Sequence, residues 1–419
     1  MNNEPFNSLA QLASTEAQRH KMLAPGDCVL AGLSGGADSV ALLYWLCSVK
    51  EEYGLKIAAA HVNHGLRGEA SDGDEAFCQE LAKTWGIPLH VRHIDIAEEA
   101  QRLGVGIEEA GRCARYSFFG EIAQQIGASK IALAHTLSDR IETFLLNFGR
   151  GAALRGLCSI PPTRALNGAP AKLDSPAARQ QNCEGSIASD RLRPPQEGDS
   201  NNNSNLMAAV KSPLLRGQMM FCQPQGNAVS MMGGGGVQSS KKSNETITII
   251  RPLIACSRAQ VEAYCALHGL RYRTDLSNFD DRYRRNAIRQ NVLPPLKDAV
   301  PGLESAARRM FSALRADEDY LAVKADKLYE SAQTGAGEWD AHILAESHTA
   351  LLGRVLRRIV AETGHDPAFW QIDEFSHILP GDYTMNLSDT LRLRCRRGIL
   401  RLESYEASPR KRGIHEKFT

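Results

Sequence analysis

Short apolar runs alternate with longer stretches of mixed polarity over the first third of the chain. The apolar runs show no helical period and cover residues 28–33, 56–62, 89–94 and 130–135. Between them, the stretches 39–52 and 74–85 are amphipathic, with apolar residues at helical spacing. This alternation predicts an α/β fold, a doubly wound parallel sheet with helices on both faces. Such sheets bind ligands where their strands end, so we expect the functional residues just after the strands.

The regular pattern stops near residue 161 and resumes at residue 246. The intervening segment is rich in Pro, Gln and Ser, and it contains the Asn and Gly runs 201–205 and 233–236. Such a composition buries too little apolar surface to offset the entropy of ordering, which predicts a low-complexity, disordered insert over 161–245. A fifth strand at 246–253 and a helix at 257–268 would then complete the domain that the insert interrupts.

The remainder of the chain has a different character. Helical patterns dominate from about residue 293 to residue 363, and 385–403 is typical of a β-hairpin with Gly398 near its turn. The sequence therefore predicts three parts. They are an α/β domain formed by 1–160 and 246–295, the insert 161–245, and a smaller, mainly helical C-terminal domain, 296–419, that ends in the hairpin.

Charge and cysteine content narrow the classes of protein. With a formal net charge of +1 over 419 residues, any contact with a polyanion must come from local basic patches. The ten cysteines are scattered and none forms a C-x-x-C pair, which argues for structural thiols in a reducing compartment. Residues 1–18 lack an apolar signal core and no apolar run reaches the length of a bilayer span, so we expect a cytoplasmic protein without a membrane partner.

The clearest chemical signal lies between the first predicted strand and the first predicted helix. It is the string Ser34, Gly35, Gly36, Ala37, Asp38 and Ser39. Glycines let the backbone approach an anion, while hydroxyls, backbone N–H groups and the helix N-terminus favour phosphate oxygens. An S-G-G-x-D-S string in this context resembles the PP-loop, the pyrophosphate-binding loop of enzymes that split ATP into AMP and pyrophosphate. The string differs from a Walker loop, which needs a Gly-Lys-Ser/Thr ending that is absent here, and the alternative is a glycine-rich turn capped by serine.

Asp38 brings a carboxylate to the place where this resemblance puts the polyphosphate. Two anions can share a site when a cation lies between them, and proteins bind Mg²⁺ through one or two carboxylates plus substrate phosphates. We therefore expect Asp38 to be a catalytic residue and the ligand of Mg²⁺, with ATP bound by residues 34–39. A purely structural role, in which the acid stabilises the helix dipole, stays open.

Five further strings narrow the class of PP-loop enzyme. They follow in order at 61–67, 109–116, 134–143, 150–157 and 275–289. Each is weak alone, but their order and spacing resemble the tRNA(Ile)-lysidine synthetase family over most of 20–160 and 246–295. The resemblance implies that the C2 carbonyl oxygen of the wobble cytidine in the CAU anticodon of tRNA(Ile) attacks the α-phosphate of ATP. Free L-lysine then displaces AMP. The sequence does not fix the oligomeric state, for which a homodimer is one alternative.

The resemblance also assigns roles to residues outside the loop. His61 and His64 would join the loop in binding ATP, although both are equally consistent with packed or exposed histidines. Arg112 would be catalytic and clamp phosphate or the activated base, and a plain helix-surface arginine is the alternative.

The string 134–143 departs from the family pattern, which is usually A-H-H-x-D-D-Q-x-E-T. His135, Asp139 and Glu142 match it and are our catalytic candidates, whereas the departures are Thr136, Ser138 and Arg140. Asp139 and Glu142 stand three residues apart on one helix face, where they would hold the lysine cation. The attacking amine must lose a proton, for which we expect a nearby carboxylate or His135 as acceptor. A solvated acidic helix surface is the alternative.

Arginines crowd at the junction of the two predicted domains and return near the end of the chain. If they line one side, they would bind RNA phosphates despite the small net charge. The RNA-binding candidates are Arg282, Arg284, Arg285, Arg289, Arg394 and Arg396. A solvated helix end is the alternative for the first four.

Two other functions stay open at this point. A tRNA thiolase shares the PP-loop, but it would need cysteines arranged for sulfur transfer or cluster binding. A non-catalytic module that binds a nucleotide or RNA could keep the fold without turnover, since fold does not fix function.

Overall fold

The computed structural model describes residues 8–65, 69–166, 246–273, 284–363, 367, 369–388 and 390–405. Most of the predicted insert lies outside the described residues. So do 66–68 and 274–283, which belong to two of the motifs and include Arg282.

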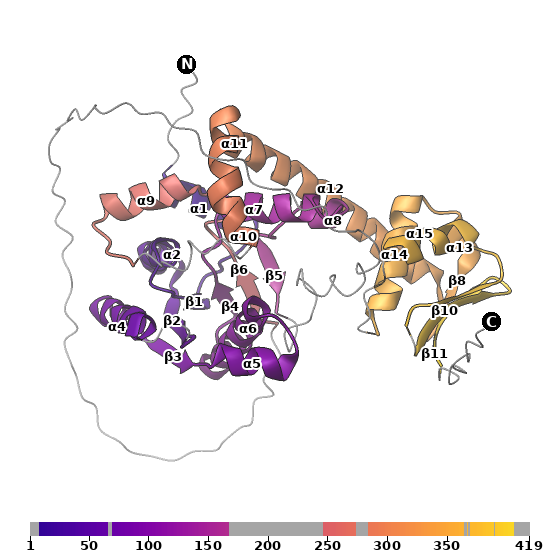
Figure 1. Ribbon diagram of the computed structural model, residues 1–419, viewed down its shortest axis with the longest axis horizontal. Coiled ribbons are helices and arrows are strands. Elements are labelled where there is room, and N and C mark those ends of the chain that lie inside the picture. The colour runs from indigo at the N-terminus through magenta and orange to yellow at the C-terminus, as the bar shows by residue number, and fades with distance from the viewer. Residues whose placement is uncertain are drawn as a thin grey trace, which may run out of the picture. The chain divides into compact units, whose positions relative to one another are not determined.

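A six-stranded sheet forms the centre of the first domain, in the order β3-β2-β1-β4-β6-β5 (Figure 1). Its strands are β1 (Cys28–Gly32), β2 (Lys56–Asn63), β3 (Leu89–His93), β4 (Lys130–Ala132), β5 (Thr163–Ala165) and β6 (Thr248–Ile250). Every neighbouring pair is parallel except β5 with β6. The predicted doubly wound sheet is confirmed. The strand order reverses between β1 and β4, and open α/β sheets bind ligands at such a switch point.

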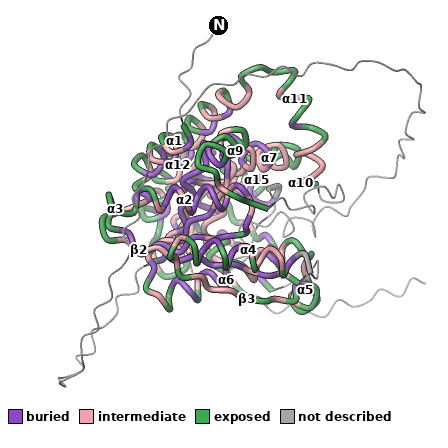
Figure 2. Tube along the Cα trace, turned by 90° about the vertical axis from the view of Figure 1, so that its left-hand side faces the viewer, coloured by how far each residue is buried: buried purple, intermediate pink, exposed green. Residues whose placement is uncertain are grey.

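Helices cover both faces of this sheet because successive strand residues point to opposite sides. In β1, Val29 and Ala31 belong to a core shared with α1 (Leu9–Arg19), α2 (Ala37–Ser48), α4 (Glu69–Thr84) and α9 (Arg258–Leu267). Leu30 belongs to the opposite core with α6 (Ile107–Ile126), which packs against α5 (Ile96–Leu103). Figure 2 shows that α2 is buried over much of its length.

Two elements of this domain escaped the sequence analysis. The sequence patterns predicted no helix before residue 28, yet Leu9, Ala13 and Ala17 of α1 recur at four-residue spacing and are buried. Strand β5 lies inside the range predicted as insert, and the backbone hydrogen bond from Leu166 to Ile247 extends the folded chain to residue 166. Three residues are too few to show an alternating pattern. The division into three parts otherwise stays a prediction.

The chain after α9 is mainly helical and ends in a second sheet. Its helices are α10 (Arg284–Ala287), the π-helical turn η4 (Ile288–Val292), α11 (Leu293–Ala299), α12 (Leu303–Ala332), α13 (Ala341–Ala345), α14 (Thr349–Ala361) and α15 (Phe369–Ile378). The second sheet is antiparallel in the order β7-β8-β11-β10-β9. Its strands are β7 (Gln333–Gly335), β8 (Glu338–Asp340), β9 (Tyr383–Asn386), β10 (Leu391–Arg396) and β11 (Ile399–Ser404).

The hairpin predicted near the end of the chain is confirmed as β10 and β11, within this larger sheet. Gly398 lies at its turn with φ +73°, and an added Cβ would come 2.6 Å from His342. The turn therefore requires glycine for both its backbone conformation and its space.

The remaining helices include α3 (Lys50–Tyr53), α7 (Leu137–Phe148) and α8 (Leu154–Leu157). On α7, Leu137 and Ile141 share a core with Phe311 of α12 and Leu293 of α11. This apolar side anchors α7 and leaves its polar side to the site described below. No helix within the described ranges combines the length and apolarity needed to cross a membrane.

Candidate active site

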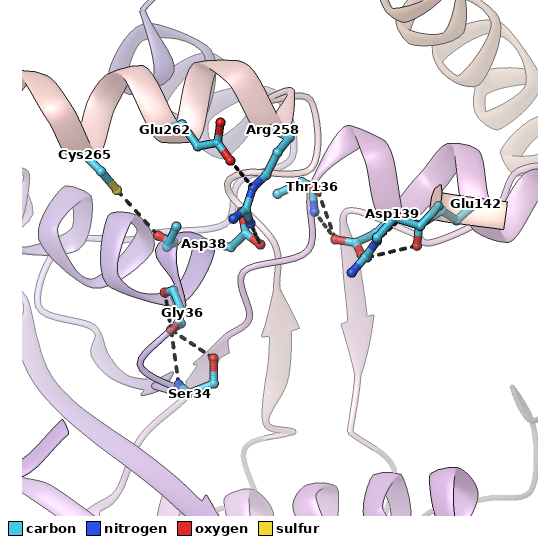
Figure 3. Close-up of polar contacts among 12 residues, drawn as sticks. Ser34, Gly36, Asp38, Thr136, Asp139, Glu142, Arg258, Glu262 and Cys265 are labelled. Atoms are coloured by element: carbon cyan, nitrogen blue, oxygen red, sulfur yellow. Dashed lines mark hydrogen bonds and ion pairs between the residues drawn. The ribbon is translucent and has the colours of Figure 1, made fainter. Parts of the chain in front are cut away.

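The loop 34–39 carries the chain from β1 into α2 at the switch point. Gly35 has φ +84° and an added Cβ would lie 3.3 Å from Cys78 Sγ, so the loop requires glycine here. Ser39 Oγ accepts from the Ser34 N–H at 3.1 Å and donates to the Gly36 carbonyl at 2.9 Å (Figure 3). Gly36 is the N-cap of α2, and no side chain of the described residues caps it. The first turn of α2 therefore offers its backbone N–H groups to an anion.

Asp38, in that first turn, has two oxygens in different environments. Oδ2 accepts from Arg258 Nη1 of α9 at 2.9 Å (Figure 3). Oδ1 is buried and has no hydrogen-bond partner among the described residues. Burial raises the pKa of Asp38 to about 6, against the opposing charge of Arg258. A buried carboxylate oxygen without a donor favours a cation, so Asp38 fits the predicted Mg²⁺ ligand.

A metal at Asp38 would need ligands from elsewhere. Within the described part of the chain, no group of three or more His, Cys, Asp or Glu side chains could hold a metal. Mg²⁺ is commonly bound through one carboxylate together with substrate phosphates, and the neighbouring loop suits phosphates. The residues present therefore fit a metal that arrives with its nucleotide.

The two histidines assigned to ATP binding lie at the end of β2. His61 is 5% exposed, and its Nδ1 lies 2.9 Å from the Leu33 carbonyl oxygen. Because a carbonyl oxygen only accepts, Nδ1 of His61 carries the proton and donates. His61 thus holds the residue that precedes the loop, whereas His64 is half-buried beyond the strand end. Direct contact of either histidine with ATP stays a prediction.

Two of the three residues in 134–143 that depart from the family pattern have structural roles. Thr136 is the N-cap of α7, and its N–H and hydroxyl both donate to Asp139 Oδ2, at 2.8 and 3.0 Å (Figure 3). Arg140 is 6% exposed and stacks its guanidinium 4.2 Å from the centre of the Phe311 ring. Thr136 therefore caps the helix and Arg140 packs against α12. Nothing in the structure explains Ser138.

Asp139 and Glu142 already have cationic partners, which are Arg285 and Arg289. Arg285 donates to Asp139 Oδ1 at 3.0 Å and to Glu142 Oε2 at 2.9 Å. Arg289 donates to the same two carboxylates at 3.2 and 2.7 Å. The Glu142 side chain is 0% exposed, which excludes the alternative of a solvated acidic surface. We call these four residues the acid–arginine cluster.

The acid–arginine cluster joins residues that the sequence assigned to different ligands. The carboxylates were predicted to hold lysine and the arginines to contact RNA, but in this structure the two sets form ion pairs with each other. Burial alone would raise the pKa of Asp139, yet Arg285 and the Thr136 N–H hold it below its usual range. In this structure carboxylates engage both guanidinium groups, and the predicted contact of Arg285 and Arg289 with RNA stays a prediction.

The other predicted RNA-binding arginines differ in exposure. Arg284 and Arg396 are exposed. Arg394 lies 3.5 Å from Glu403 through its Nη1, and the same carboxylate also pairs with Arg392. Arg396 is therefore better placed than Arg394 to meet a phosphate.

His135 lies just beyond β4, across the switch point from the loop. Arg251 directly follows β6, is 2% exposed and donates from Nε to His135 Nδ1 at 3.1 Å. Its Nη1 also donates to the Pro161 carbonyl at 2.8 Å. Burial, followed by the charge of Arg251, lowers the pKa of His135 well below the usual imidazole value. His135 is therefore neutral at physiological pH.

Further arginines make the surroundings of His135 positive. Arg112, a predicted catalytic residue, lies 5.5 Å from the ring centre of Tyr116, and Arg164 lies 5.3 Å from the same ring. The positive charge of Arg112 also contributes to the low pKa of His135. An anionic group would be favoured here.

Arg251 and Arg258 were missed by the sequence analysis. The strand expected at 246–253 ends at Ile250, so the prediction placed Arg251 inside the sheet when it stands at the strand end. Arg258 opens the next helix. The rule that ligands gather after strands could have selected Arg251, whereas no signal in the sequence singles out Arg258.

Comparison with known proteins agrees with this geometry. The family model of the PP-loop domain matches residues 8–175 and 217–296, more than half of the chain, and the chain belongs to this family. A tRNA(Ile)-lysidine synthase of Clostridium tetani is 27% identical over 346 residues, which are 82% of this chain and 56% of that protein. The tRNA(Ile)-lysidine synthase of Geobacter sulfurreducens is 31% identical over 317 residues, 76% of this chain and 50% of that protein. The chain thus spans about half the length of the curated relatives it matches.

Among solved structures, the U34-tRNA thiolase NcsA from Methanococcus maripaludis aligns with a TM-score of 0.43 and 15% sequence identity. The alignment covers 73% of this chain and 77% of that one. This likeness is too distant for the chemistry of that protein to be transferred.

Proposed function

We propose that this chain forms lysidine in tRNA(Ile) at the expense of ATP. The C2 carbonyl oxygen of the wobble cytidine in the CAU anticodon attacks the α-phosphate of ATP, and pyrophosphate leaves. The amine of L-lysine then attacks C2 and displaces AMP. The observation that carries the ATP step is the buried Asp38 Oδ1 without a donor, beside the uncapped start of α2. The similarity to proteins named tRNA(Ile)-lysidine synthase supports the choice of substrates.

In the first step, the loop 34–39 holds the phosphates of ATP through backbone N–H groups and the exposed Ser34 hydroxyl. Asp38 would hold Mg²⁺ through Oδ1, and Mg²⁺ would neutralise the charge that develops on pyrophosphate. Arg258 keeps Oδ2 occupied and orients the carboxylate. The transferred group is thereby positioned and its charge stabilised, which is the main requirement of phosphoryl chemistry.

In the second step, Asp139 and Glu142 hold the lysine cation. In this structure Arg285 and Arg289 already pair with both carboxylates, so lysine must displace at least one guanidinium group. The exchange is feasible because a cation replaces a cation, and the buried Glu142 is never left uncompensated. A carboxylate of this pair would also accept the proton that the attacking amine loses.

The rival function of sulfur transfer is not favoured by the cysteines that the structure describes. Eight free cysteines are described, and burial raises the pKa of every one of these thiols. For Cys78 and Cys256 the pKa rises to about 12. A nucleophilic or cluster-ligating cysteine needs the opposite, a stabilised thiolate.

One assay tests the proposal directly. The protein is incubated with ATP, Mg²⁺, labelled lysine and total tRNA, and the tRNA is then digested to nucleosides. We expect label in a modified cytidine, dependent on ATP and absent with the Asp38→Ala variant. Release of pyrophosphate without lysine incorporation would assign the chain to another PP-loop reaction. Absence of both would indicate a non-catalytic module.

A further inference from the structure

The hydrogen bond between Arg251 and His135 restricts the chemistry of the histidine. An arginine side chain can only donate, so Nδ1 of His135 must use its lone pair to accept from Arg251 Nε at 3.1 Å. A neutral imidazole has one protonated and one unprotonated nitrogen. The proton of His135 therefore resides on Nε2, and the ring has no lone pair left for a substrate proton.

His61 provides a contrast within the same sheet. Its Nδ1 faces a carbonyl oxygen at 2.9 Å and must carry the proton. His61 lies in β2 and His135 follows β4, and their hydrogen-bond partners impose opposite tautomers. His61 is fixed by an acceptor, and His135 by a donor.

We propose that Arg251 is a positioning residue that fixes His135 as a neutral imidazole protonated at Nε2, which then donates a hydrogen bond to an anionic phosphoryl oxygen of the substrate. This inference rests on the proposed function for its substrate. No hydrogen bond joins Nε2 to any residue in the described ranges. In this role His135 donates a hydrogen bond and is not the proton acceptor that the sequence suggested. The proton of the lysine amine then goes to a carboxylate.

The charges around His135 support this role. Arg251 follows β6, Arg112 comes from α6, Arg285 from α10 and Asp139 from α7, and the charges of the three arginines disfavour a second proton on the imidazole. The charge of Asp139 acts in the opposite sense. A neutral donor among fixed positive charges suits an oxygen that gains negative charge during the reaction.

Nitrogen NMR on protein labelled with ¹⁵N-histidine tests the tautomer without any assay of activity. The His135 signals are assigned by their loss in His135→Gln. We expect Nδ1 of His135 to show the shift of an unprotonated nitrogen, Nε2 that of an N–H, and no titration between about pH 5 and 8. His61, with the opposite tautomer, is the internal control. A protonated Nδ1 on His135, or titration near pH 6.5, would overturn the proposal.

Side-chain replacement separates a donor from a base. The amide nitrogen of Gln can reach the position of imidazole Nε2 and donate, but it cannot take up a proton. If His135 donates, His135→Gln should keep tRNA-dependent pyrophosphate release within about tenfold of the wild type, whereas His135→Ala loses about 100-fold. Equal losses in Gln and Ala would overturn the donor role.

Arg251 itself is tested by Arg251→Gln, with Arg251→Lys as the conservative variant. We expect a titrating His135 signal and a new acid limb in the pH–rate profile of Arg251→Gln, and partial recovery of the wild-type profile in Arg251→Lys. An unchanged His135 signal in folded Arg251→Gln would contradict the positioning role. Should both variants fail to fold, the wild-type NMR measurement still decides the tautomer. A correct tautomer in a protein without lysidine activity would refute the proposed function alone.

Discussion

Two carboxylate sites, which follow the neighbouring strands β1 and β4, differ in how completely their oxygens are paired with other residues of the protein. Asp38, after β1, has one oxygen paired with Arg258 and one buried oxygen without a donor among the described residues. Asp139 and Glu142, after β4, are saturated by Arg285 and Arg289. An incompletely satisfied buried carboxylate favours binding of an external cation, whereas a saturated one must first release an internal cation.

This difference implies an order of events in the proposed reaction. A cation bound at Asp38 Oδ1 would replace no hydrogen bond of that oxygen, because Oδ1 has no donor among the described residues. The acid–arginine cluster, by contrast, would have to open before lysine could bind there. A reactive adenylate would thus form while the lysine subsite is still occupied by arginine.

The largest effect is expected at the incompletely satisfied site. Asp38→Asn should lower tRNA-dependent pyrophosphate release at least about 100-fold, because the neutral amide is a poor ligand for Mg²⁺. Its melting temperature should stay the same or rise, since a buried oxygen without a donor no longer carries charge. Steady-state pyrophosphate assays and thermal unfolding check both parts.

Glu262→Gln is the matched control for this variant. Glu262 accepts from Nε of the same Arg258 at 2.8 Å, but it belongs to α9 and not to the loop. Its replacement disturbs Arg258 to a similar degree and should leave pyrophosphate release near the wild-type rate. Loss of activity in both variants would show that Arg258, and not the Asp38 carboxylate, matters.

The second effect concerns stability at the saturated site. Arg285→Ala combined with Arg289→Ala should destabilise the protein by about 3–5 kcal/mol, because the fully buried Glu142 loses both of its cations. Urea unfolding measures the change. Adding Asp139→Asn and Glu142→Gln removes the uncompensated charges and should restore much of the loss. Equal stability of the double variant and the wild type would mean that the cluster is open in solution.

The acid–arginine cluster also shows where sequence reasoning reached its limit. The strands and the PP-loop string follow from local patterns, and Asp38 follows β1 and Asp139 follows β4 in the structure as those patterns predicted, whereas the roles of these residues stay predictions. The pairing of Glu142 with Arg285 and Arg289 joins residues more than 140 positions apart. Charge patterns in the sequence give the sign of each group but not its partner, so they could not predict that the candidate lysine-binding carboxylates pair with the candidate RNA-binding arginines.

Arg140 illustrates the same limit within one motif. It departs from the family pattern beside two matching acids, which suggested altered lysine recognition. In the structure it packs over Phe311, on a helix that the local sequence does not identify as a neighbour. Tertiary packing explains Arg140, and the predicted lysine-binding residues Asp139 and Glu142 match the family pattern.

The third effect is on lysine dependence. Glu142→Gln should raise the apparent KM for lysine about tenfold, the equivalent of one charge-assisted hydrogen bond, and change pyrophosphate release little. Glu403→Gln is the matched control, because Glu403 also pairs with two arginines, Arg392 and Arg394. Lysine titrations of labelled tRNA product measure the effect. An unchanged KM in Glu142→Gln would place the lysine subsite elsewhere.

The smallest effect is expected on RNA binding, at Arg394 and Arg396 near the end of the chain. Each phosphate contact that is lost should reduce the salt slope of RNA binding by about 0.7 to 0.9. Arg396 is exposed, whereas Arg394 shares Glu403 with Arg392, so a phosphate that approaches Arg394 also meets a carboxylate. Arg396→Ala should therefore flatten the slope by about one contact, and Arg394→Ala should change it less. The measurement is tRNA affinity at several salt concentrations, with ATP affinity as the control for folding. Equal slopes in both variants and the wild type would show that this end of the sheet does not touch RNA, and a larger change in Arg394→Ala would show that the pair with Glu403 opens on binding.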